Sequence, residues 1–455
     1  MKLSVQKCCS LLQAEYNGLP IDVTIDSIVI DSRSLQNSAT TLFFALVGPN
    51  NDAHSHIKEL IEKGVQYFVV THIPEDCQGN ANFLIVNNTL VALQQFATYY
   101  RSLFDFPVIG ITGSNGKTIV KEWLNFLLSP EYSIIRSPKS YNSQVGVPLS
   151  VIGINEQHNF GIFEAGISTV SEMEKLATII RPTIGVLTNI GSAHDEGFTN
   201  TAEKIKEKLQ LFKQAQILIY PKNEAIDAQI RPELKTVSWS FSDPKAAVLV
   251  TKKQQGVHTQ LQFTSPTITF DILIPFQDDA SIENAISCTL VLLYLKYDAQ
   301  TIQHRMAQLY PVEMRLKLKD GINNCTLIDD SYSADFQSLK IALDFLESQK
   351  QSVKKTIILS DIFQSGLTNA ELYARVAQLI VANNISRVIG IGNTISQFKN
   401  HFENCSTFET TAEFLSHIEQ LNFDAETILI KGARSFHFEK IVSALEEKTH
   451  ETVLE

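Results

Sequence analysis

The segment VIGITGSNGKTIVKEW (residues 108–123) combines residue types that bind phosphate. It joins an apolar run to a glycine-rich turn and then to helix-forming residues. The turn consists of Gly113, Ser114, Asn115 and Gly116. Backbone N–H groups in such a turn, at the positive end of a helix, can surround an anion. Lys117 can reach the β- and γ-phosphates of a nucleotide and the Thr118 hydroxyl can bind Mg²⁺, so the segment predicts a site for Mg-ATP.

The spacing departs from the strict GxxxxGK[ST] pattern, because the residue five positions before Gly116 is Ile111. The glycines lie at positions 110, 113 and 116. An alternative interpretation is a strand-to-helix turn in which the glycines only permit tight bending. A Gly-Lys-Thr helix start directly after a buried strand favours the phosphate site.

Glu164 and His194 each follow an apolar run that is typical of a buried parallel strand. Ligand sites in open α/β sheets gather at the carboxyl ends of such strands. A carboxylate at Glu164 would be costly there without a cation, which makes Mg²⁺ a natural partner. The alternatives are a capping or salt-bridging glutamate and a surface or core histidine.

Lys208 falls on the apolar side of a predicted helix, although surface lysine is the default in a charged run such as EKIKEKLQLF. The apolar residues at helical spacing around it are Ile205, Leu209 and Phe212. Burial lowers the pKa of a lysine. A lysine in such a place is more readily neutral, and only a neutral amine can take up CO₂ to form a carbamate.

The elements that must position these side chains alternate between short apolar strands and helices from residue 107 onward. This alternation predicts a doubly wound parallel sheet in residues 106–310, with a helix at 281–295 and a β-rich insert over 235–276. Residues 1–105 indicate a small mixed α/β domain. A second parallel α/β domain is expected in residues 311–455, because 455 residues exceed one hydrophobic core.

The net charge, the cysteines and the apolar stretches of the sequence argue against several classes of protein. The formal net charge of -11 argues against general nucleic-acid binding, which needs a basic surface. The six cysteines lack zinc-site spacing and indicate no disulfide framework. No apolar stretch reaches about 18 residues and no signal peptide is evident, so we expect a cytoplasmic protein with no membrane partner.

Seven motifs occur in one order along the chain, and together they resemble the Mur ligase family. They are DSR (31–33), NGKT (115–118), NSQVGVP (142–148), FEAGIS (163–168), TNIGSAHDEGF (188–198), the helix around Asn284, and LIDDSY (327–332). The resemblance covers nearly the whole chain and is greatest to members that join D-alanyl-D-alanine to UDP-N-acetylmuramoyl-tripeptide.

The resemblance implies three α/β domains: a UDP-substrate-binding domain, a central P-loop ATPase domain, and a Rossmann-like ligase domain that closes over the nucleotide. In the implied reaction, ATP phosphorylates the peptide carboxylate and the dipeptide amine then attacks the acyl phosphate. The residues implied to bind two Mg²⁺ ions are Thr118, Glu164, His194 and N-carboxylated (carbamylated) Lys208. Lys206 is the competitor for the modified lysine.

Further roles follow from the same resemblance. Asn284 would contact adenine, while Arg315 and Asp330 would reach the phosphates and ribose after closure. The alternatives are an ordinary polar helix residue for Asn284 and structural ion pairs for Arg315 and Asp330. The residues implied to bind the UDP-sugar or its muramoyl part are Asp31, Ser32, Arg33, Asn142 and Ser143.

Several positions depart from the usual family pattern. The usual His-Asn before Asn284 reads Ala280-Ser281, and Phe336 departs from the usual DDSYNANP. These departures resemble a branch fused to alanine racemase, which implies that the chain is one half of a longer polypeptide. A sibling ligase that adds a single amino acid, of the diaminopimelate or folylpolyglutamate type, and a non-catalytic nucleotide-binding module are the alternatives.

Overall fold

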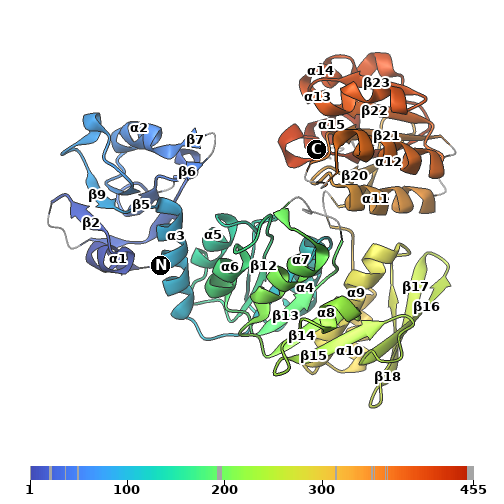
Figure 1. The fold of residues 1–455 in the computed structure, drawn as a ribbon, viewed down its shortest axis with the longest axis horizontal. Helices are drawn as coiled ribbons and strands as arrows, with labels where there is room; N and C mark the ends of the chain where they lie inside the picture. The colour runs from blue at the N-terminus through green and yellow to red at the C-terminus, as the bar shows by residue number, and fades with distance from the viewer. Residues whose placement is uncertain are drawn as a thin grey trace, which may run out of the picture.

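The computed structural model describes residues 2–447 except 20–22, 36, 49–50, 192–196, 313–314, 350–351, 353, 364 and 366. Three lobes follow one another along the chain, each built on its own main sheet (Figure 1). The predicted three-part α/β fold is confirmed. The boundaries 1–105, 106–310 and 311–455 stay a prediction, although each main sheet lies within one of these ranges.

The first lobe holds a five-stranded sheet in the order β2-β9-β8-β5-β4. Its strands are β2 (Glu15–Asn17), β9 (Asn82–Ile85), β8 (Tyr67–Val70), β5 (Thr41–Phe44) and β4 (Ser27–Val29). The helices are α1 (Val5–Leu12), α2 (Ile57–Glu62) and α3 (Thr89–Ser102). Four strands run parallel, and β2 pairs antiparallel with β9 at the edge.

The middle lobe holds nine strands in the order β11-β12-β10-β13-β14-β15-β16-β17-β18. The parallel part consists of β11 (Ile134–Arg136), β12 (Phe160–Glu164), β10 (Val108–Thr112), β13 (Ile184–Leu187), β14 (Ile217–Pro221) and β15 (Lys235–Ser240). β16 (Val248–Gln255) joins β15 in parallel, and β17 (His258–Thr264) and β18 (Thr269–Ile274) complete an antiparallel meander. The β-rich character expected over 235–276 is confirmed, but these strands are not a separate insert, because they extend the main sheet by edge pairing.

Helices cover both faces of this nine-stranded sheet. One face packs on α4 (Lys117–Leu128), α9 (Asp279–Tyr294) and α10 (Ala299–Met306). The other packs on α5 (Gly146–Ile152), α6 (Met173–Ile180) and α7 (Thr201–Leu209). The core on this second face continues through α3 into the first lobe. α9 begins two residues earlier than expected because the Asp278 carboxylate caps it, accepting from the Ser281 N–H at 2.8 Å.

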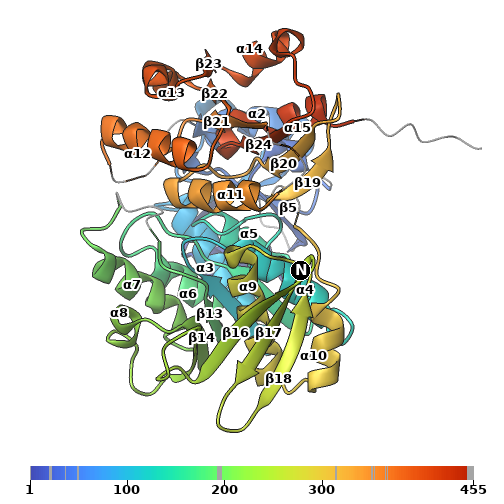
Figure 2. The same cartoon turned by 90° about the vertical axis from the view of Figure 1, so that its right-hand side faces the viewer.

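The last lobe holds six strands in the order β19-β20-β24-β21-β22-β23. They are β19 (Lys317–Asp320), β20 (Thr326–Asp330), β24 (Thr427–Lys431), β21 (Lys355–Ser360), β22 (Arg387–Ile391) and β23 (Cys405–Phe408). The main helices are α11 (Phe336–Ser348), α12 (Asn369–Ala382), α13 (Asn393–Gln397), α14 (Thr411–Ser416) and α15 (Glu439–Leu445). Figure 2 shows this lobe above the middle one, with α11 on the side that faces it. Two cores of its own fill it.

No helix among the described residues is long and apolar enough to cross a bilayer.

Candidate active site

The loop between β10 and α4 has the backbone that phosphate binding requires. Gly113 and Gly116 have φ of +146° and +81°, a region that favours glycine. A Cβ on Gly116 would lie 2.3 Å from Asn284 Oδ1, and one on Gly113 would lie 2.0 Å from Thr188 Oγ1. Both glycines are therefore needed, and Asn284 closes on the loop from α9.

Lys117 folds back over this loop. Its ammonium donates to the carbonyls of Gly113 and Ser114 at 2.8 and 2.9 Å. Burial lowers its pKa to about 8. The next residue, Thr118, places its Oγ1 3.1 Å from Glu164 Oε2 and 3.0 Å from Ser140 Oγ.

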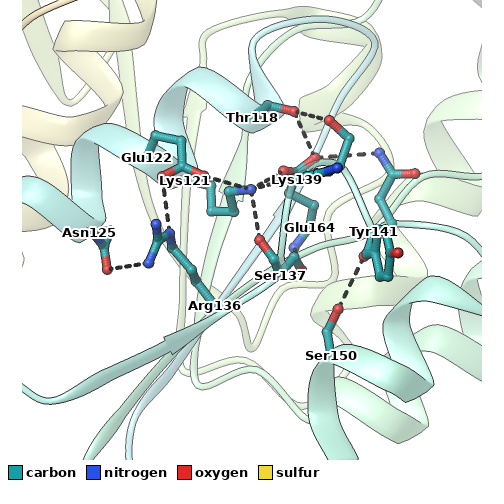
Figure 3. Close-up of polar contacts among 12 residues, drawn as sticks. Thr118, Lys121, Glu122, Asn125, Arg136, Ser137, Lys139, Tyr141, Ser150 and Glu164 are labelled. Atoms are coloured by element: carbon teal, nitrogen blue, oxygen red, sulfur yellow. Dashed lines mark hydrogen bonds and ion pairs between the residues drawn. The ribbon is translucent and has the colours of Figure 1, made fainter. Parts of the chain in front are cut away.

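Glu164 ends β12 and is fully buried beneath the loop, as its place after an apolar run predicts. Its Oε2 faces Thr118 and also lies 3.4 Å from Asn142 Nδ2. Its Oε1 lies 3.1 Å from Lys121 Nζ and forms an ion pair with it, but the angles at this contact do not allow a hydrogen bond. Figure 3 shows the carboxylate between Thr118 and Lys121.

Lys121, which sequence reasoning did not place in the site, is fully buried. Its ammonium donates to the Ser137 carbonyl at 2.8 Å and to the Lys139 carbonyl, and it pairs with Glu122 at 2.9 Å (Figure 3). Its place one helical turn after Lys117, with buried Val120 and Leu124 one and three residues away on α4, was the available signal. The carbonyls that hold it come from a loop whose course the sequence pattern does not reveal.

Lys208 lies on the buried side of α7, as the helical spacing predicts, whereas Lys206 is exposed. Its Nζ lies 3.2 Å from the Gly113 carbonyl. Burial, with Lys117 and Lys204 nearby, holds its pKa well below the ordinary value. Lys204 is also buried and donates to the Gly191 carbonyl, a contact that sequence reasoning missed. His194 lies outside the described residues.

A cavity of about 410 Å³ opens between the phosphate loop and the last lobe. Most of the predicted nucleotide and muramoyl residues line it: Ser114, Asn115, Gly116, Lys117, Thr118, Asn142, Ser143, Asn284, Arg315 and Asp330. Asp31, Ser32 and Arg33 do not, because they lie in the first lobe. There Asp31 pairs with Arg33 at 2.6 Å, which lowers the Asp31 pKa to about 2.

The last lobe brings a connected set of polar residues to this cavity. Asp330, at the end of β20, pairs with buried Lys431 at 2.6 Å, and Lys431 also donates to the Ser333 carbonyl at 2.6 Å. Arg315 donates to Ser333 Oγ at 2.8 Å, and its guanidinium lies 4.6 Å from the Tyr332 ring centre. The structural ion pair considered for Asp330 is thus present, and Asp330 still lines the cavity.

The chain is similar to known proteins in both sequence and fold. The family model for the Mur ligase middle domain matches residues 111–292. UDP-N-acetylmuramoyl-tripeptide--D-alanyl-D-alanine ligase of Rickettsia prowazekii is 29% identical, covering 93% of this chain and 96% of the relative. The enzyme of the same name from Escherichia coli strain K12 is 27% identical over 98% of this chain and 99% of its own.

Residues 111–292 of this chain therefore form a Mur ligase middle domain. Among solved structures, MurF from Acinetobacter baumannii has the same fold, with a TM-score of 0.82 at 23% identity over 98% of this chain and 99% of its own. MurF from Thermotoga maritima in complex with ADP gives 0.75 at 18% identity over 92% and 96%.

The donor set at the phosphate loop fits a hard cation. Within the described part of the chain, no three His, Cys, Asp or Glu side chains gather as a metal cluster. The Thr118 hydroxyl and the Glu164 carboxylate nevertheless meet at 3.1 Å, and the second carboxylate oxygen pairs with the Lys121 ammonium without accepting a hydrogen bond. Oxygen ligands of this kind suit Mg²⁺, which is held through one or two protein groups together with substrate phosphates.

Proposed function

We propose that this protein joins D-alanyl-D-alanine to UDP-N-acetylmuramoyl-tripeptide, with ATP converted to ADP and phosphate. One observation carries the proposal: the phosphate loop, with Glu164 buried beneath it, meets the C-terminal Arg315 and Asp330 around one cavity. This arrangement occurs in a chain that matches relatives of that activity over nearly their whole length.

In the proposed reaction, a carboxylate oxygen of the tripeptide attacks the γ-phosphorus of ATP and ADP leaves. The dipeptide amine then attacks the acyl carbon, phosphate leaves, and the amine loses its proton. Loop N–H groups and Lys117 hold the phosphates, because they are preorganised around negative oxygens. The last lobe keeps water from the acyl phosphate.

Two Mg²⁺ ions, when bound, would supply positive charge where phosphate and carboxylate oxygens approach each other. We assign them to Thr118, Glu164, His194 and a carbamylated Lys208. The buried position and lowered pKa of Lys208 support the carbamate, because they favour the neutral amine. Asp31, Ser32 and Arg33 are assigned to the UDP-sugar.

The proposal places the enzyme in the cytoplasm. The six cysteines are free, as in proteins of a reducing compartment. The racemase half remains a prediction about sequence beyond these 455 residues.

Phosphate release tests the proposal. Release is expected with ATP only when the UDP-muramoyl peptide and D-alanyl-D-alanine are both present. Lys208→Ala should abolish it, whereas Lys206→Ala, at an exposed position on the same helix, should not. Release with a single amino acid in place of the dipeptide would identify a sibling ligase, and no release with any amine would identify a non-catalytic module.

A further inference from the structure

An arginine follows β24 at the wall that the last lobe contributes to the cavity. Arg434 is exposed and begins a short 3-10 helix, Arg434–Phe436. Its guanidinium lies 5.7 Å from the Tyr332 ring centre, and Nη1 donates to Tyr332 Oη at 3.3 Å. It makes no ion pair within the described part of the chain. Tyr332 thus steadies a guanidinium whose charge is not neutralised.

The other cations on this wall already have roles. Among the described residues that line the cavity, the cationic side chains are Lys117, Arg315 and Arg434. Lys117 is held by two loop carbonyls and Arg315 by Ser333. Arg315 also lines a neighbouring cavity of about 650 Å³, beside the start of α9, which Arg434 does not line. Of these three described cations, Arg434 alone neither contacts the phosphate loop nor lines the neighbouring cavity. It is therefore free to bind another part of the substrates.

The incoming substrate of the proposed reaction needs such a cation. Its amine must be uncharged to attack, but its other end carries a carboxylate at neutral pH. Two extended residues span about 7 Å, so this carboxylate lies well away from the reacting carbon. A carboxylate held inside a closing cavity requires a charged, hydrogen-bonding partner, and the arginine fork fits it with two parallel bonds.

We propose that Arg434 binds the C-terminal carboxylate of the incoming dipeptide and that Tyr332 holds its guanidinium in place. The assignment rests on the proposed function and adds a specificity residue to it. A fixed carboxylate site at the far end of the dipeptide would also measure its length, which disfavours single amino acids.

Steady-state kinetics with two amine substrates test the assignment. The pair is D-alanyl-D-alanine and its C-terminal amide, which lacks the negative charge. Wild-type enzyme should have a KM for the acid roughly 10- to 100-fold below that for the amide, the range expected for a hydrogen bond between charged groups. Arg434→Gln should raise the KM for the acid to that for the amide. Arg434→Lys should fall between, because it keeps the charge and loses the fork.

Arg375→Gln, at an exposed position on α12, is the matched control and should behave as wild type. An equal rise for acid and amide in Arg434→Gln, or a wild type that does not distinguish them, would overturn the assignment. Thermal unfolding of each variant with and without ADP checks that folding and nucleotide binding persist. Absence of any dipeptide-dependent phosphate release in the wild type would instead refute the proposed function.

Discussion

Lys121 offers a severe test of the reasoning about buried charge, since it holds Glu164 from a fully buried position. Lys121→Met would leave the Glu164 carboxylate without its cation and two loop carbonyls without their donor. Removing one partner of a buried pair costs about 3–5 kcal/mol, so we expect the free energy of unfolding to fall by that amount.

The reverse change should be milder. Glu164→Gln leaves Lys121 with two carbonyls and with Glu122, which is partly exposed. We expect a cost of about 1 kcal/mol, as for one ordinary hydrogen-bonded contact. The double variant should recover about 2 kcal/mol relative to the sum of the single changes, because no buried charge then remains unpaired.

Tryptophan fluorescence during urea unfolding measures these differences. Both tryptophans, Trp123 and Trp239, are buried in the middle lobe and report on the region that contains Lys121. The experiment uses EDTA, so that no metal replaces the lysine charge. Lys213→Met removes an exposed pair with Glu174 and should cost less than about 1 kcal/mol. A cost for Lys121→Met no greater than this control, or simple additivity in the double variant, would refute the reasoning.

Two further predictions concern the loop and Lys208. Gly116→Ala should weaken ADP binding at least about tenfold, as measured by calorimetry, because the new Cβ adds strain of about 1–2 kcal/mol and displaces Asn284. Gly256→Ala is the control: this glycine also has a positive φ, but its Cβ would meet nothing within 4 Å, so ADP affinity should not change. Lys208→Met should stabilise the metal-free protein near neutral pH, as measured by urea midpoints. The unfolded wild type binds more protons than the folded one between the lowered pKa and 10.5, so wild-type stability rises with pH there and the gap should close as pH approaches 10.5. A gap that widens with pH would contradict the burial argument.

The sequence predicted the site best where one element sets a side chain's surroundings. Glu164 ends a buried strand and Lys208 follows helical spacing, so strand and helix periodicity located both. Lys121 and Arg434 were missed, because their roles depend on loop carbonyls and on a tyrosine from a distant strand end. The extent of the nine-stranded sheet was misjudged for a related reason: pairing of β15 with β14 is a contact between backbones, which side-chain patterns do not record.

The core that runs through α3 from the first sheet onto α5 and α6 has a consequence for building chimaeras of Mur ligases. A crossover near residue 105 would leave every sheet intact but would divide the apolar core that α3 shares with α5 and α6. The first lobe of one relative would then pack against core side chains that come from another. The last lobe encloses its interior within its own residues. Exchange between relatives should therefore succeed more readily at the link before β19 than at the end of α3.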